Sequence, residues 1–319
     1  MQRNPSMQEQ VVLRAATDDD ADRLAAFLNT CTLRHQGVAR SSPADARVTL
    51  YEHGIDPAAD SRLALSDDEI VGFARVWEAD QEEMRLYART PPDATGRGIG
   101  SALLAFCEGR ACELTRGSRE LTTTSWAADD QAPGLLSARG FAPVRYFLQM
   151  RIAGEELPRR AAWPDDITVE ACSEGNIEDA ALYEAWRAAF AGHWGRPVHG
   201  PEAFWEERRD AGREIFPFDP SLWFVATSAG EVAGFVLCEQ NGDLGRVAEL
   251  GVVDEFRGRG LGLALLTHGF HELRGRGATE IVLDVDAENV TSALRLYRKA
   301  GMTEHPSFTI WGKEIQGQA

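Results

Sequence analysis

The chain carries one glycine-rich segment twice, and each copy stands immediately before an apolar helical pattern. The first copy reads DATGRGIGSALLAFCE, from Asp93 to Glu108, and the second reads DEFRGRGLGLALLTHGF, from Asp254 to Phe270. Aligning Gly98 with Gly260 sets the copies 162 residues apart in a chain of 319 residues. A repeat of this length predicts two domains of the same kind.

Both halves show one order of expected elements. Each opens with a strand followed by a capped helix, as in VVLRAATDDDADRLAAFL and ITVEACSEGNIEDAALYEAW. A hairpin follows in each half, with a turn at Asp67-Asp68-Glu69 in the first and at Ser228-Ala229-Gly230 in the second. After the glycine segment come a helix, a strand and a further helix, which in the second half ends at Gly301. This order predicts two α/β domains, each with a mixed sheet, and the proline-containing linker at 153–166 predicts domains at 1–155 and 156–319.

Composition narrows the classes of function. The net charge of −17 argues against a general nucleic-acid binder, which needs a basic surface. The five cysteines are scattered and never spaced CxxC, so neither a disulfide framework nor a metal site is expected. The polar start of the chain and the lack of long apolar runs predict a cytoplasmic protein without a membrane segment.

A glycine-rich turn between a strand and a helix is suited to binding an anion. The first turn of the helix presents free N–H groups, and glycine allows a phosphate to approach the backbone closely. The dinucleotide pattern GxGxxG fails here, because its last position is Leu263 or Leu265, and a P-loop would need a lysine that is absent. What remains from Arg257 to Gly262 is the pattern R-x-x-G-x-G.

This pattern resembles the pyrophosphate loop of the GNAT superfamily of acyltransferases, which bind acetyl-CoA. The surrounding segments resemble the family too: VAELGVV precedes the loop, EIVLDVDAEN follows its helix, and NVTSALRLYRKAGM matches the segment that closes the acyl-CoA cleft. The resemblance covers roughly residues 167–311. It implies two tandem domains of the α/β class, each with a mostly antiparallel central sheet flanked by helices.

The resemblance also implies roles for individual residues. The backbone of Gly258, Arg259, Gly260, Leu261 and Gly262 would hold the pyrophosphate of acetyl-CoA, with added charge from Arg257 and Arg259. Val252 and Val253 would orient the acetyl group and the pantetheine arm, and Asn289 would fix the cofactor or cap the last helix. No metal is expected, because a thioester is already activated.

Two side chains are candidates for proton transfer. Tyr297 is the expected acid for the departing thiolate, with a core aromatic as the alternative. Glu249 is a candidate base on the strand before the loop, although the family often places its glutamate at the position of Arg246. In a regular strand these two positions face opposite sides, unless a bulge intervenes. His193 is a second candidate base.

The acceptor site is less defined. The aromatic segment at 190–205 would wall an acceptor pocket or form a domain interface. In the first half, Thr95 replaces the usual arginine or glutamine, and Ala128 and Leu136 stand opposite Asn289 and Tyr297. Pro133 is expected to interrupt the helix there. We therefore expect a degenerate N-terminal domain and a catalytic C-terminal domain.

The leading prediction is an acetyl-CoA-dependent N-acetyltransferase that acts on the primary amine of a small molecule by direct attack, as a monomer or homodimer. Acceptors from mycothiol synthesis or antibiotic inactivation fall within it. Two alternatives stay open: an acetyltransferase of protein lysines or N-termini, and a non-catalytic acyl-CoA-binding sensor.

Overall fold

The computed structural model contains two compact units. The residues that it describes are 11–36, 39, 41–172, 179–191, 200–201, 216, 218–288 and 290–317. One unit combines Met1–Tyr146 with Phe308–Ala319, and the other is Phe147–Ser307. The first unit is therefore not one consecutive length of chain, and the division into units does not coincide with the expected boundary between residues 155 and 156.

Two long strands explain this division. In β12 (Thr303–Gln316), residues from Phe308 onward pair antiparallel with β5 (Ser118–Trp126) in the first unit. In β6 (Ala142–Ala153), residues from Phe147 onward pair antiparallel with β11 (Glu280–Asp286) in the second unit. Each half of the sequence thus supplies a strand to the sheet of the other half. The repeated glycine segment predicts which elements follow one another along the chain. It does not predict that each half supplies a strand to the sheet of the other.

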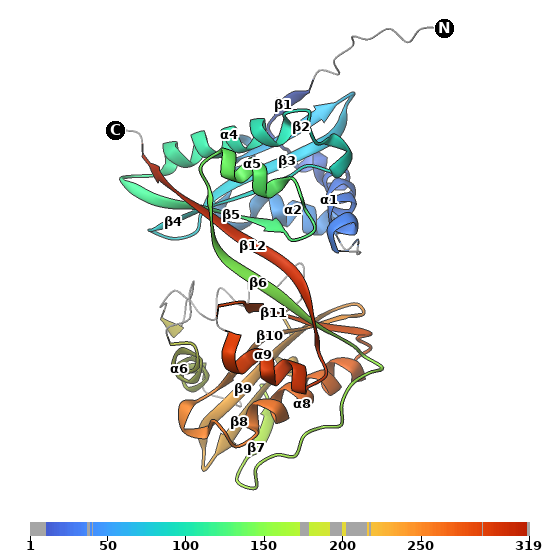
Figure 1. The fold of residues 1–319 in the computed structure, drawn as a ribbon, viewed down its shortest axis with the longest axis vertical. Coiled ribbons are helices and arrows are strands. Elements are labelled where there is room, and N and C mark those ends of the chain that lie inside the picture. The colour runs from blue at the N-terminus through green and yellow to red at the C-terminus, as the bar shows by residue number, and fades with distance from the viewer. Residues whose placement is uncertain are drawn as a thin grey trace. The chain divides into compact units, whose positions relative to one another are not determined.

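The N-terminal unit is a mixed sheet with helices on both faces (Figure 1). Its remaining elements are β1 (Val12–Arg14), α1 (Ala21–Gln36), α2 (Pro43–Tyr51), α3 (Pro57–Asp60), β2 (Ser61–Ser66), β3 (Glu69–Glu78), β4 (Glu83–Arg89), α4 (Ile99–Leu114) and α5 (Ala132–Ala138). The strand order is β1-β2-β3-β4-β5-β12, and only the β4–β5 pair among these is parallel. One core lies between the sheet and α4 and α5, and the other lies under α1 and α2.

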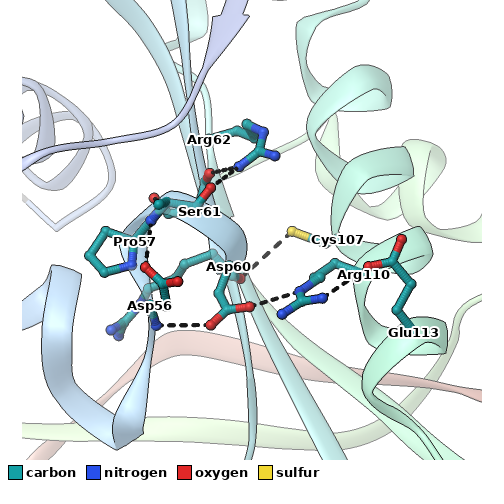
Figure 2. A network of polar contacts seen from close by, with 10 residues as sticks. Asp56, Pro57, Asp60, Ser61, Arg62, Cys107, Arg110 and Glu113 are labelled. Carbon is teal, nitrogen blue, oxygen red and sulfur yellow. Dashed lines mark hydrogen bonds and ion pairs between the residues drawn. The ribbon is translucent and has the colours of Figure 1, made fainter.

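A polar network ties α4 to the neighbouring strand and the short α3 helix (Figure 2). The Arg110 guanidinium donates to the buried Asp60 carboxylate over 2.8 Å and to Glu113 over 3.0 Å. Asp60 also accepts the backbone N–H of Asp56 over 2.9 Å. A buried carboxylate needs such partners to offset its lost hydration. The network fixes the helix that begins at the first glycine segment.

The C-terminal unit repeats this plan. Its remaining elements are β7 (Thr168–Ala171), α6 (Asp179–Ala189), β8 (Trp223–Ser228), β9 (Glu231–Asn241), β10 (Leu244–Val252), α8 (Leu261–Gly275) and α9 (Val290–Lys299). The strand order is β6-β11-β10-β9-β8-β7, with β10 and β11 parallel. The larger core packs under α8 and α9, and a second core rich in aromatic residues packs under α6 (Figure 1).

Local predictions from the sequence are confirmed. The hairpin turns have positive φ at Asp67 and Asp68, and at Ala229 and Gly230, as two-residue hairpin loops require. Gly301 ends α9 with φ of 88°. The mixed and mostly antiparallel sheet flanked by helices is also as expected. Among the described residues, no helix is both long and apolar enough to cross a membrane.

Candidate active site

The glycine loop of the C-terminal unit leaves its backbone open. Gly258 and Gly260 have φ of 77° and 86°, and a Cβ built on either would meet nothing within 4 Å. Gly260 caps α8, so the N–H groups of Leu261 and Gly262 have no acceptor within the helix. The loop therefore presents unused donors beside free space, which fits the pyrophosphate of acetyl-CoA.

Both arginines of the loop are engaged with protein groups. Arg257 donates to the Val252 carbonyl over 3.1 Å and pairs with Asp254 over 2.8 Å. Arg259 pairs with Asp166, at the end of the linker. This guanidinium holds the pKa of the exposed Asp166 carboxyl below its usual range. The charge expected at the pyrophosphate is thus partly balanced by neighbouring carboxylates.

The parallel strands β10 and β11 separate next to the loop. Their pairing runs only from Leu244 opposite Glu280 to Arg246 opposite Val282, although both strands continue. The Val253 N–H donates to the Ala233 carbonyl of β9 over 3.0 Å. Because successive N–H groups of a strand point to opposite sides, the Val252 N–H points away from β9 and towards the gap. Of the two valines, Val252 thus has its N–H on the side of the gap.

A β-bulge in β10 determines where Glu249 lies. The register with β9 shifts between Val247 and Glu249, so Ala248 is an extra residue in the strand. A Cβ built on Gly245 would lie 2.9 Å from Leu273 of α8, so the next residue, Arg246, faces the α6 side, and Glu249 faces the same side. The opposition expected for a regular strand is therefore removed by the bulge.

The Glu249 carboxylate accepts a hydrogen bond from the indole N–H of Trp186 on α6. Trp186 is buried in the aromatic core of the unit, where it stacks with Tyr183 and makes a tilted ring contact with Phe190. A rigid indole in this position fixes the direction of the carboxylate. Nothing in the sequence spacing links residues 186 and 249, so Trp186 could not be identified before the fold was known.

Tyr297 lies on α9 and packs against the larger core of the unit. Burial raises the pKa of its phenol to about 12. The hydroxyl makes no hydrogen bond within the part of the chain that the structure describes, so its O–H is not engaged as a donor there. Leu296, its neighbour, lies 3.4 Å from a Cβ built on Gly262, which places α9 beside the glycine loop.

Several expected site residues lie outside the described residues. These are Asn289, the candidate base His193, and the aromatic residues Trp194, His199, Phe204 and Trp205. Their expected roles stay predictions.

Comparison with known proteins decides the family. Residues 180–302 match the model described as Acetyltransferase (GNAT) family, and residues 59–143 match an Acetyltransferase (GNAT) domain. A mycothiol acetyltransferase of Thermomonospora curvata is 34% identical over 295 residues, covering 91% of this chain and 92% of its own. That of Nocardia farcinica is 31% identical and covers 83% of this chain and 88% of its own.

The chain belongs to the GNAT acetyltransferase family. A GCN5-related N-acetyltransferase from Sphaerobacter thermophilus superposes with a TM-score of 0.80 at 28% identity, covering 97% of both chains. A tandem GNAT protein from the clavulanic acid biosynthesis pathway shares the fold, with a TM-score of 0.70 at 16% identity over 97% of this chain. The protein is thus an acyltransferase with two GNAT domains.

The N-terminal GNAT domain has the same glycine loop geometry but a different strand beside it. Gly96 and Gly98 have φ of 77° and 78°, and Gly98 caps α4. The β3–β4 register shows no bulge, and with the loops aligned Tyr87 occupies the place of Glu249. Pro133 does not interrupt α5, because it lies in the first turn, where proline is tolerated.

Proposed function

We propose that this GNAT enzyme transfers the acetyl group of acetyl-CoA to the primary amine of a small molecule, and that the C-terminal unit performs the chemistry. The observation that carries the proposal is the meeting of three features in that unit. These are the open glycine loop, the gap between β10 and β11, and the carboxylate directed by the bulge. The relatives from Thermomonospora curvata and Nocardia farcinica are named mycothiol acetyltransferases, which supports a small-molecule acceptor and makes the mycothiol acetylation step the first to test.

Glu249 is the proposed base. An alkylamine has a pKa near 10 and is protonated at neutral pH, so a group in the site must take up a proton before or during attack. Trp186 directs the Glu249 carboxylate through its indole N–H. The carboxylate would accept the proton directly or through one water molecule.

The backbone at the end of β10 is the proposed site of charge stabilisation. Acetyl-CoA supplies a thioester, which is activated towards an amine without a metal. The Val252 N–H, pointing into the gap, would donate to the acyl oxygen as negative charge develops there. A fixed donor at such a position lowers the barrier because it needs no reorganisation during the reaction.

Tyr297 is proposed to stabilise the leaving sulfur. With a pKa of about 12 the phenol stays protonated at every pH at which the enzyme would work. A thiol has a pKa near 8.5, so complete transfer of the phenolic proton to the thiolate would be uphill by about 5 kcal/mol. The phenol therefore acts by donating a hydrogen bond to the thiolate, and solvent supplies the proton that finally leaves with the product.

The direct test is the release of free thiol from acetyl-CoA in the presence of small primary amines and of lysine-containing peptides. We expect turnover with a small amine, and a loss of about 10²- to 10⁴-fold in kcat for Glu249→Gln. Glu280→Gln is the matched control, since Glu280 is a strand carboxylate of the same unit that pairs with Arg151 over 3.4 Å. Turnover with peptides alone would contradict the proposed acceptor, and tight acetyl-CoA binding without turnover of any amine would indicate a non-catalytic binder.

A further inference from the structure

A row of alternating arginine and aromatic side chains crosses the sheet of the N-terminal unit. In spatial order its members are Trp77, Arg75, Tyr87, Arg89 and Trp126. Successive distances from guanidinium carbon to ring centroid are 4.7, 5.7, 4.3 and 5.6 Å. All four distances lie within the range of cation–π attraction, so each side chain of the row attracts its neighbours.

Arg89 of this row spans the gap between the parallel strands. As in the other unit, the pairing of β4 with β5 ends early, at Arg85 opposite Thr122. Beyond that point the Arg89 guanidinium donates to the Thr124 carbonyl of β5 over 3.3 Å. With the glycine loops aligned, the residue at this place in the C-terminal unit is Gly251, which has no side chain. The pairing supports the alignment, because Arg89 lies opposite Phe73 as Gly251 lies opposite Phe235.

A cavity of about 700 Å³ leads from the glycine loop of the N-terminal unit to Arg89. Its walls come from the loop at 95–100, the end of β5 and the start of α5. This volume is in the usual range for a small-molecule site. The glycine loop and the Arg89 guanidinium thus line the same cavity.

Arg89 is the partly buried cation among the charged side chains of the cavity lining. Arg34 and Asp130, which are opposite in charge, are both exposed members of the lining. Of the acidic residues there, Asp129 accepts the N–H groups of Gln131 and Ala132, both over 3.0 Å. Within the described ranges Arg89 makes no ion pair, although it is half-buried. A half-buried cation gains most from a ligand that supplies the missing negative charge.

We propose that the N-terminal cavity binds an acyl-CoA whose acyl group ends in a carboxylate, and that Arg89 recognises this carboxylate. Because the same side chain closes the gap through which an acyl group would meet an amine, the bound thioester is held and not transferred. The N-terminal unit thus discriminates between acyl-CoA species by the charge at the end of the acyl group. The proposal rests on the proposed role of the glycine loops as CoA sites.

Two stable analogues test the recognition of charge. S-carboxymethyl-CoA and S-carbamidomethyl-CoA are thioethers of nearly equal size that differ in the charge of their last group. Binding of each is measured by calorimetry on the full chain carrying Gly260→Trp, which fills the open space of the C-terminal loop. We expect the carboxymethyl analogue to bind about tenfold more tightly, as for one charge-assisted contact. The preference disappears when Arg89→Met is added.

The control is Arg85→Met, because Arg85 lies on the same strand but pairs with Glu83 over 2.9 Å at the surface. It should keep the tenfold preference. If Arg89→Met fails to fold, Arg89→Lys keeps the charge and should retain part of the preference. Equal affinity for the two analogues, or no binding of either, overturns the proposal. Acetyl-CoA binding to the chain carrying Gly98→Trp, measured in parallel, reports separately on the C-terminal site and hence on the proposed function.

Discussion

Replacing Tyr297 with phenylalanine isolates the contribution of one hydroxyl to the reaction. The ring packs in the larger core of the C-terminal unit and stays in place, so only the donor is removed. The lost interaction is a hydrogen bond to a developing thiolate, and hydrogen bonds to charged groups contribute about 1.5–3 kcal/mol. This corresponds to a fall in kcat of about 10- to 150-fold. The affinity for acetyl-CoA should change little.

The raised pKa of Tyr297 also predicts how kcat depends on pH. With a pKa of about 12, against an ordinary value of 10.0, roughly one Tyr297 phenol in a thousand is ionised at pH 9. The donor is therefore present throughout the range from pH 6 to 9.5. The profiles of kcat against pH for the wild type and for Tyr297→Phe should run parallel on a logarithmic scale.

The assay is thiol release in steady state and in a single turnover, which separates chemistry from product release, with calorimetry of acetyl-CoA on the same preparations. Tyr146→Phe makes the same chemical change on an exposed ring and serves as the control. An unchanged single-turnover rate in Tyr297→Phe would show that the phenol only packs. A basic limb that is present in the wild type and absent from the variant would show that Tyr297 ionises within this range, contrary to the argument from burial.

Three further predictions concern the two units. Gly260→Trp should abolish acetyl transfer while Gly98→Trp leaves most of it, and equal losses in two folded variants would contradict the inequality of the units. Gly251→Ala should lower the free energy of unfolding by about 1–3 kcal/mol, because the new Cβ would clash with the ring of the wholly buried Phe235; urea unfolding measures this. Arg14 lowers the pKa of the buried Asp20 carboxyl from 3.8 to about 2. The pair therefore stabilises the fold by roughly 2 kcal/mol above about pH 4, and this stabilisation is lost as the pH falls towards 2. The stability difference between the wild type and Asp20→Asn should shrink over that interval.

The sequence by itself determined the elements whose conformation is local. The residues at each hairpin turn tolerate positive φ, and the glycines before α4 and α8 are the only type that takes such φ without strain, so these sites are marked in the chain itself. The apolar spacing after each glycine loop then fixes a helix that must bury one face. From these signals came the repeat, the family resemblance and most of the expected cofactor-binding residues.

The tertiary structure decided what depends on pairing between distant segments. Strand periodicity says which face a residue takes but not its partner strand, so the exchange of β6 and β12 between the units has no mark in the sequence. A bulge likewise appears only against its partner strand, and it alone brings Arg246 and Glu249 to one face. The row that contains Arg89 joins side chains of three strands, and Arg89 matters because it spans the gap between two of them. In the chain alone, Arg89 is one arginine among many, because a guanidinium acquires a function only from the groups that surround it.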